Sequence, residues 1–273
     1  MKNGILIIFI TAIIIMTGVS VILLSKYSDK IPEKIISKNV DYQCNGIPLE
    51  GCIAYGDCIL GKRPAVIIVH EWDGLGDYVK RRAEEIARLG YLAFGADIYG
   101  KGVRPGSREE SAKLAGTYRA DPKLMRERIT AALEEVKKNP LVDKENIAVM
   151  GYCFGGGVAL ELARSGADIR GAVSFHGSLN NLEPAVTRTI NAKILILHGA
   201  DDRSVTPEAI TAFENEMRGA RTDWQMVIYG NAVHGFTNSA NGNDSSKGVA
   251  YDQTADRRSW EAMKGFFKEI FQK

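Results

Sequence analysis

The stretch from Pro64 to His70 constrains the fold of this chain more than any other feature. Up to Val69 its residues are apolar and mostly β-branched, without the polar alternation that a half-exposed strand shows. Such an unbroken run is typical of a strand that is buried on both faces inside a parallel sheet. Because parallel strands need long crossover connections, the rest of the domain is expected to alternate strands with helices.

That alternation continues through the remaining sequence, after a hairpin signal at Asn45-Gly46. The expected strands are 40–44, 49–55, 64–70, 91–96, 146–150, 171–175, 194–197 and 224–229. The expected helices are 78–89, 121–138, 154–164, 207–217 and 254–271. This order predicts a mostly parallel sheet with helices on both faces.

The N-terminus has a different character. Residues 4–24 carry no charge and are rich in Ile, Leu and Val, and a helix of that length spans about 30 Å of hydrocarbon. The run is longer than the apolar part of a cleaved signal peptide, and no small-residue cleavage pattern follows it. We therefore predict a transmembrane anchor at 1–25, a linker at 26–38 and one domain at 39–273. A cleaved signal segment and a buried core helix are the alternatives.

Two observations bear on the side of the membrane on which the domain lies. Lysines are more numerous just after the apolar segment than before it, which favours a cytoplasmic domain. Cys44, Cys52 and Cys58 cluster in a short stretch and could include a disulfide, which favours an oxidising compartment. Their alternative role is that of small buried hydrophobes. We expect an extracytoplasmic domain, anchored to the membrane or secreted after cleavage.

Charge and motifs narrow the possible partners. The net charge is +2, with no basic stripe and no nucleic-acid-binding motif, so a nucleic-acid partner is not expected. No histidine follows the cysteine cluster at metal-ligand spacing, so no metal site is predicted there.

Residues 151–155, Gly-Tyr-Cys-Phe-Gly, lie between an expected strand and an expected helix. This is the nucleophile-elbow pattern Gly-x-Ser-x-Gly with Cys153 at the serine position. The sharp turn lifts the side chain clear, and the start of the following helix favours a thiolate. The N–H of Phe154 is then placed to donate to an oxyanion. The alternatives are a phosphate-binding turn, whose fingerprints are not matched, and a buried, inert cysteine.

Two further groups follow in the order that this pattern needs. Asp202 comes after the strand 194–197, and His234 comes after the strand 224–229. Nucleophile, acid and histidine is the chain order of α/β-hydrolases. His234 is the expected general base for Cys153, and Asp202 is expected to orient its ring, with Asp201 as the alternative acid. Three other histidines at strand ends are expected to be structural: His70, His176 and His198.

Taken together, these residues resemble the dienelactone hydrolase family. The likeness spans 40–271 and rests on 151–156, on 69–74 (Val-His-Glu-Trp-Asp-Gly), on Asp202 and on 234–236 (His-Gly-Phe). Members are hydrolases of the α/β-hydrolase fold that open lactones and other activated esters with a Cys-His-Asp set. The resemblance implies a small-molecule ester or lactone as substrate, and no metal or organic cofactor.

The resemblance also implies roles for two neighbouring residues. Glu71 stands where the family has a glutamate that contacts the resting cysteine and shifts when substrate arrives, so that thiolate forms on demand. A carboxylate that only caps its loop is the alternative. The N–H of Trp72 is implied as the second oxyanion donor.

The chain departs from the family pattern in two ways. Well-studied members hold a substrate carboxylate with two arginines, one of them shortly after the catalytic histidine, where this chain has Asn238. Arg104, Arg108 and Arg119 lie in a lid-like stretch, 99–119, but none corresponds cleanly. A substrate carboxylate is therefore expected to be held poorly. The second departure is the membrane segment, since typical members are soluble and cytoplasmic.

The sequence thus predicts an ester or lactone hydrolase with a cysteine nucleophile. A thioesterase or peptidase on the same fold is an alternative within enzymes. Outside that class, the alternatives are a non-catalytic, membrane-tethered binding module and a redox sensor built on Cys153.

Overall fold

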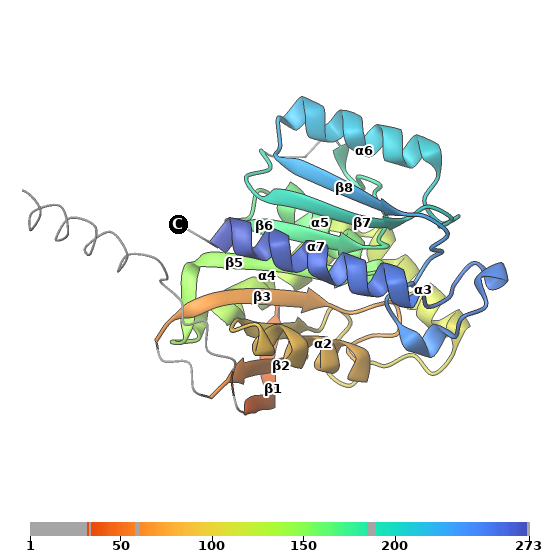
Figure 1. Ribbon diagram of the computed structural model, residues 1–273. Coiled ribbons are helices and arrows are strands. Elements are labelled where there is room, and N and C mark those ends of the chain that lie inside the picture. The colour runs from red at the N-terminus through yellow and green to blue at the C-terminus, as the bar shows by residue number, and fades with distance from the viewer. Residues whose placement is uncertain (1–31, 33, 58–60, 185–188, 272–273) are drawn as a thin grey trace, which may run out of the picture.

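The computed structural model describes residues 32, 34–57, 61–184 and 189–271 (Figure 1). The predicted membrane segment at 1–25 lies outside these residues, as does Cys58. In the part that is described, no helix combines the length and the apolar character needed to cross a membrane. The predicted linker ends earlier than expected, because a strand already begins at Ile35.

The described residues form one eight-stranded sheet with the order β1-β2-β4-β3-β5-β6-β7-β8. Strands β1 and β2 form an antiparallel hairpin, β2 is antiparallel to β4, and all the other pairs are parallel. The strand bounds are β1 Ile35–Cys44, β2 Ile47–Gly56, β3 Arg63–Val69, β4 Leu92–Ala96, β5 Val142–Tyr152, β6 Gly171–Phe175, β7 Lys193–Gly199 and β8 Trp224–Tyr229.

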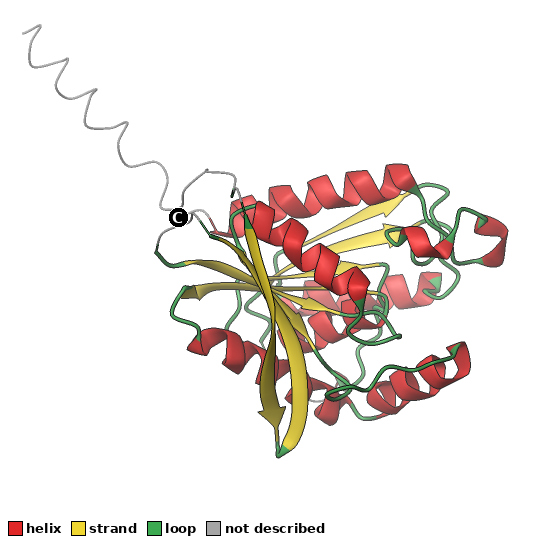
Figure 2. Cartoon of the chain, turned by 90° about the horizontal axis from the view of Figure 1, so that it is seen from below, coloured by secondary structure: helices red, strands yellow, loops and turns green. Residues whose placement is uncertain are grey.

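Helices cover both faces of this sheet, as Figure 2 shows. Their bounds are α2 Asp77–Arg88, α3 Arg108–Ala120, α4 Pro122–Lys138, α5 Phe154–Arg164, α6 Pro207–Ala220 and α7 Gln253–Phe271, with short 3-10 turns η2 Ser239–Asn241 and η3 Ser245–Lys247. Buried side chains of α2 and α7 belong to one apolar cluster, and those of α3 to α6 belong to the other. The predicted α/β architecture is confirmed.

Strand β3 shows why both faces are covered. Each of residues 65–69 has no exposed surface, and the side chains alternate between the two apolar clusters, Ile67 in one and Ile68 in the other. Because a strand directs successive side chains to opposite faces, an unbroken apolar run needs a cover on each side. The prediction made from this stretch is confirmed.

The hairpin turn at Asn45-Gly46 is also confirmed, since both residues have positive φ, 49° and 79°, as this kind of tight turn requires. The cysteines on its two strands are free and buried. Cys44 lies in one apolar cluster and Cys52 in the other, so these two thiols pack on opposite faces of the sheet and do not bond to one another.

Helix α3 lies almost entirely in the stretch 99–119, for which the sequence predicts only a lid-like segment. Ser107 caps the helix by accepting a hydrogen bond from the N–H of Glu110, and Ser-x-x-Glu is a recognised start signal. Only Ser111, Ala115 and Tyr118 of this helix are buried. Its apolar stripe is therefore too narrow to reveal a helix by periodicity.

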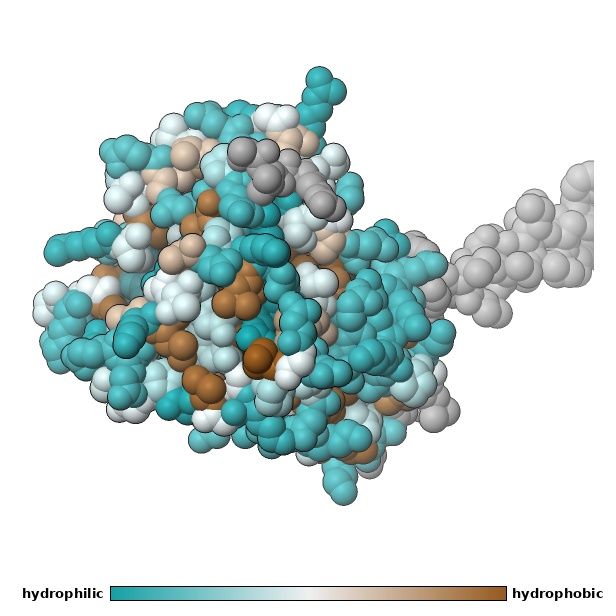
Figure 3. Space-filling model, turned by 180° about the vertical axis from the view of Figure 1, so that it is seen from behind, coloured by the Kyte–Doolittle hydropathy of each residue, from teal (hydrophilic) through white to brown (hydrophobic). Residues whose placement is uncertain are grey.

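The surface offers no single large apolar face in the view of Figure 3, which shows mostly hydrophilic side chains with small, separate hydrophobic groups. The large hydrophobic residues that are exposed in the described part, Ile47, Val103 and Ile228, come from separate elements or loops.

Candidate active site

The predicted catalytic residues lie at the carboxyl ends of parallel strands. Cys153 directly follows β5, Asp202 lies in the loop after β7, and His234 lies in the loop after β8. Strands β5, β6, β7 and β8 are consecutive neighbours and all run in the same direction. Their carboxyl ends therefore meet at one edge of the sheet, where α/β proteins place their sites.

Cys153 occupies a tight turn between β5 and α5. Its φ of 53° and ψ of −115° are rare for a residue with a side chain, and such strain persists only where the surroundings hold it. The N–H of Cys153 donates to the carbonyl of Phe175 on β6 at 3.0 Å. A side chain at Gly155 would collide with the carbonyl oxygens of Val69 and His70. The flanking glycines are thus needed for close packing.

The structure brings the three predicted residues into contact. The Nε2 atom of His234 lies 3.0 Å from the Sγ of Cys153, and its Nδ1 lies 2.8 Å from the Oδ2 of Asp202. Asp202 is 4% exposed, whereas the neighbouring Asp201 is exposed to solvent. Of the two candidate acids, Asp202 is therefore the one that contacts the imidazole.

Hydrogen bonds within this group favour the charged forms of both Asp202 and His234. Burial by itself would raise the pKa of Asp202, but hydrogen bonds from His234 and Ser204 outweigh it and lower that pKa to about 2. Burial would lower the pKa of His234, but its bonds to Asp202 and Cys153 raise it to about 10. An imidazolium has a donor on each nitrogen, so at neutral pH Nδ1 donates to the carboxylate and Nε2 donates to the sulfur.

Ser204 also belongs to this group, although it is not among the site residues predicted from the sequence. Its hydroxyl donates to the Oδ1 of Asp202 at 2.5 Å, and its backbone N–H donates to the same oxygen at 2.9 Å. Its Oγ also lies 3.1 Å from the Nδ1 of His234. An Asp followed two residues later by Ser is a local turn signal, and that signal could have indicated this contact.

The two predicted oxyanion donors come from adjoining segments. The N–H of Phe154 opens helix α5, where a backbone donor has no partner inside the helix. Trp72 lies just beyond β3, whose end packs against the first turn of α5. The carbonyl of Trp72 accepts from the hydroxyl of Tyr99 at 3.1 Å. The oxyanion role of these two N–H groups stays a prediction.

Glu71 has a different partner from the one that the resemblance implied. Its Oε2 accepts from the Nδ2 of Asn238 at 2.7 Å, while the Oδ1 of Asn238 accepts from the N–H of Ala240 at 3.1 Å. Burial raises the pKa of Glu71 to about 7, although the Asn238 hydrogen bond opposes this rise. In this arrangement the carboxylate pairs with an amide and the sulfur of Cys153 pairs with His234.

The other three histidines lie near the same edge of the sheet. Burial lowers the pKa of His70 to about 4. Its Nδ1 contacts the carbonyl of Glu71 at 2.5 Å, and its Nε2 accepts from the N–H of Ile98 at 3.2 Å, as expected of a structural residue. Burial also lowers the pKa values of His176 and His198. His176 touches the His234 ring, with centroids 5.3 Å apart.

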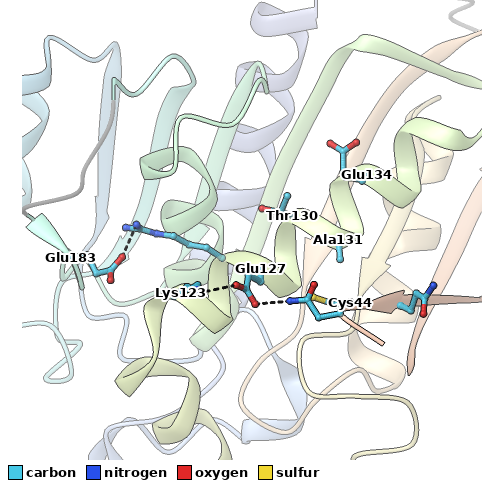
Figure 4. Close-up of a pocket in the computed structure, with 10 residues that line it drawn as sticks. Cys44, Lys123, Glu127, Thr130, Ala131, Glu134 and Glu183 are labelled. Atoms are coloured by element: carbon cyan, nitrogen blue, oxygen red, sulfur yellow. Dashed lines mark hydrogen bonds and ion pairs between the residues drawn. The ribbon is translucent and has the colours of Figure 1, made fainter. Parts of the chain in front are cut away.

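A cavity of about 580 Å³ lies elsewhere, between the hairpin turn and helix α4 (Figure 4). Its side chains pair with one another: Asn45 with Glu127 at 2.9 Å, and Arg126 with Glu183 at 2.8 Å. None of the predicted site residues lines it. Among the residues that the structure describes, no cluster of His, Cys, Asp or Glu could hold a metal ion.

Solved structures with 36% identity to this chain share its fold. The model of the dienelactone hydrolase family matches residues 49–271. A solved structure named m3DLH is 36% identical, with a TM-score of 0.84, over 87% of this chain and 99% of that chain. A dienelactone hydrolase-like promiscuous phosphotriesterase from metagenomic libraries is 36% identical, with a TM-score of 0.83, over 86% of this chain and 98% of its own. A Bradyrhizobium protein named as a probable 2-oxo-3-(5-oxofuran-2-ylidene)propanoate lactonase is 27% identical over 216 residues, 75% of this chain and 85% of that protein.

Proposed function

Because the chain belongs to the dienelactone hydrolase family and has its α/β-hydrolase fold, we propose that it hydrolyses activated esters or lactones with Cys153 as nucleophile. One observation carries the proposal: a single imidazole, that of His234, lies 3.0 Å from the sulfur and 2.8 Å from a buried carboxylate. A cysteine activated by a base that a third group orients is the arrangement nucleophilic catalysis requires.

The proposed reaction has two halves. The Cys153 sulfur attacks the carbonyl carbon, and the resulting oxyanion accepts from the N–H groups of Phe154 and Trp72. Such donors are each worth about 3–4 kcal/mol to the transition state. His234 gives its proton to the leaving oxygen, which departs and leaves an acyl-thioester on Cys153. His234 then takes a proton from water as the oxygen of that water attacks the acyl carbon. The bond between that carbon and the sulfur breaks, which releases the acid and leaves the thiolate beside the imidazolium of His234.

The substrate class follows from the nucleophile and its surroundings. A thiolate is a good leaving group, so the first intermediate goes forward only if the ester or lactone has a better one. The position after His234 at which family members bind a carboxylate carries the amide of Asn238, which is bonded to Glu71. We therefore propose an uncharged acyl group next to this pair. The Bradyrhizobium relative, by its name a lactonase acting on a propanoate, supports the lactone part but not the absence of a carboxylate.

A second candidate activity is phosphotriester hydrolysis. It is favoured by the 36% identity to a promiscuous phosphotriesterase, of which 98% is covered. A phosphotriester is also uncharged, and its phosphoryl oxygen would face the same two N–H groups.

The experiment measures hydrolysis of p-nitrophenyl acetate by the purified full-length chain. We expect Cys153→Ala and His234→Ala each to lower kcat by about 1,000-fold or more. Cys44→Ala is the matched control, since it removes a free, buried thiol away from the site, and it should keep activity within about twofold of wild type. Full turnover in Cys153→Ala would contradict the proposal.

Parallel assays separate the alternatives. An uncharged lactone, a dienelactone carboxylate, an acyl thioester, a peptide and a phosphotriester are compared by kcat/KM. The proposal expects the uncharged lactone and the aryl ester to lead. No turnover of any of these substrates, with reversible oxidation of Cys153, would favour the redox sensor. No turnover and no oxidation would favour the binding module.

We further propose that residues 1–25 anchor the domain to a membrane, with the domain on the extracytoplasmic side. The support is the charge-free apolar run at 4–24. The free thiols of Cys44 and Cys52 give no support from a disulfide between them. The mass of the mature protein decides between a retained and a cleaved segment, and protease accessibility in intact cells decides the side.

A further inference from the structure

Thr237, three residues after His234, makes polar contacts through both its hydroxyl and its backbone carbonyl. It is 2% exposed. Its hydroxyl lies 2.7 Å from the hydroxyl of Tyr78 and 2.9 Å from the Nε2 of His176. Its carbonyl accepts from the Nη2 of Arg82 at 3.0 Å and from the Tyr78 hydroxyl at 3.3 Å. The loop that carries His234 is therefore bound to α2 and to the end of β6.

The hydrogens in this group can be assigned. The Nδ1 of His176 is buried and has no hydrogen-bond partner among the residues that the structure describes, and an orphaned N–H is the costlier and rarer case. We therefore assign the proton of the neutral ring to Nε2, which then donates to the hydroxyl of Thr237. That hydroxyl donates to Tyr78, and Tyr78 donates to the carbonyl of Thr237. Each of the two hydroxyls thus both donates and accepts, and the chain of bonds has one direction.

His176 adds contacts of its own to this loop. Its ring lies edge-on to the rings of His234 and Phe236, with centroids 5.3 and 5.1 Å apart. Its φ of 39° is positive, although the residue is not glycine, and such a backbone is kept where surrounding structure demands it. The strained strand end thus directs an uncharged imidazole against the ring of the proposed base.

Arg82 fixes the other side of the group. Its guanidinium pairs with Asp256 on α7 at 2.6 Å and with Glu85 on α2 at 2.9 Å. It also lies over the rings of Tyr78, Tyr152 and Trp260. A planar cation held by two carboxylates and three aromatic rings has little freedom, so its bond to the carbonyl of Thr237 is a rigid one.

We propose that Thr237 and His176 are positioning residues for His234, holding its loop so that Nε2 stays within reach of the Cys153 sulfur. This inference rests on the proposed function. Neither residue touches the sulfur, so each acts through the loop and the His234 ring. The same loop ends at Asn238, which bonds to Glu71. One group of hydrogen bonds therefore sets both the imidazole and the buried carboxylate.

The test compares Thr237→Val, which keeps the shape but removes the hydroxyl, with Thr237→Ser, which restores it. In the full-length chain we expect Thr237→Val to lower kcat by about 10- to 100-fold, because small displacements of a base are costly. KM should change less than about twofold, since no substrate contact is lost. Thr237→Ser should recover most of the rate. Thr211→Val removes an exposed hydroxyl from α6 and is the matched control.

A second readout does not depend on turnover. Alkylation of Cys153 by iodoacetamide, without substrate, is measured from pH 5 to 10 for each variant. The charged and titratable groups that face the sulfur–imidazole pair are Asp202, Glu71, Tyr99, His176 and His198. None of these five residues is substituted in Thr237→Val, and only His176 loses a hydrogen-bond partner. We expect this variant to react more slowly at pH 7 by a factor similar to its loss of kcat.

The outcomes separate this inference from the proposed function. If wild type hydrolyses nothing but Thr237→Val still slows alkylation, the positioning role stands and the hydrolase proposal fails. If wild type is active and Thr237→Val matches it in both kcat and alkylation, the positioning role is overturned. A lower melting temperature with unchanged kcat per folded molecule also overturns it. Should Thr237→Val not fold, Tyr78→Phe removes one hydroxyl of the same group and is expected to lower kcat and alkylation together.

Discussion

The imidazole of His234 lies between two acceptors, the carboxylate of Asp202 at Nδ1 and the sulfur of Cys153 at Nε2. Each hydrogen bond favours the charged ring, and together they outweigh the cost of burying it. Because both acceptors bond to the same ring, removing either one changes the proton affinity of the His234 imidazole. The three residues therefore form one hydrogen-bonded unit.

Replacing Asp202 by Asn tests that unit. Removal of the carboxylate takes away a cause of the raised pKa of His234, so the ring should lose its proton at a lower pH than in wild type. We expect kcat for p-nitrophenyl acetate to fall by about 100- to 10,000-fold. A pH titration of the His234 ring by NMR measures the shift. The matched control, Asp201→Asn, changes the exposed neighbour and should leave both quantities unchanged. Equal losses in the two variants would contradict the assignment.

The sequence allowed some of these residues to be predicted and not others, for a physical reason. Cys153, Asp202 and His234 each carry a local signal, namely a glycine frame or a place after a strand, and their chain order is informative. Their catalytic roles stay a prediction. The bond between Glu71 and Asn238 joins residues 167 positions apart. No local pattern reports such a contact, and it depends on how two loops pack.

At the scale of elements, the approach of α5 to β3 places Cys153. The first turn of α5 lies so close to the end of β3 that only glycine fits at position 155. The helix start is thereby fixed beneath the sulfur and beside the segment that carries Glu71 and Trp72. A displacement of α5 would move the nucleophile and the Phe154 N–H together.

Gly155→Ala tests this contact. The added methyl group would meet the backbone carbonyls of Val69 and His70, the latter at 2.6 Å, and backbone cannot rotate away as a side chain can. We expect a loss of at least about 2–3 kcal/mol in the free energy of unfolding, measured in urea. Gly157→Ala, two residues on, meets nothing closer than 3.7 Å. It should instead stabilise the protein by about 0.5–1 kcal/mol. Equal effects of the two changes would contradict the packing argument.

Elements with strong periodicity were predicted well, whereas those held by few buried side chains were not. Strand β3 and helices α2, α4 and α7 lie within a residue or so of the expected ranges. Helix α3 was missed because it presents only three buried residues. Strand β5 begins at Val142 rather than 146, because Asp143, Lys144 and Glu145 interrupt the apolar pattern while the backbone remains extended.

At the scale of the whole molecule, the sheet order brings loops from distant parts of the sequence to one edge. The two central strands, β3 and β5, are covered on both sides by apolar clusters. Because both faces of these strands are covered by apolar side chains, the polar side chains of the site lie at the carboxyl ends of the strands. Arg82 connects this edge to α7 through Asp256, so the C-terminal helix supports the site as well as the core. Burying so many polar groups lowers the free energy of unfolding.

The loss of stability that a buried ionisable group causes can be measured at Glu71. The residue is 8% exposed, and burial raises its pKa from 4.5 to about 7 in the folded protein. Below pH 4.5 both the folded and unfolded states are protonated and no cost arises. Between pH 4.5 and 7 the unfolded state ionises while the folded state keeps its proton, so the fold loses up to about 3 kcal/mol, and this loss is complete above pH 7. Glu71→Gln keeps an acceptor for Asn238 and avoids the charge. Urea unfolding should therefore show this variant gaining stability over wild type between pH 5 and 8. Glu134→Gln, on the exposed side of α4, should show no such trend, and a difference for Glu71→Gln that stays constant with pH would contradict the argument.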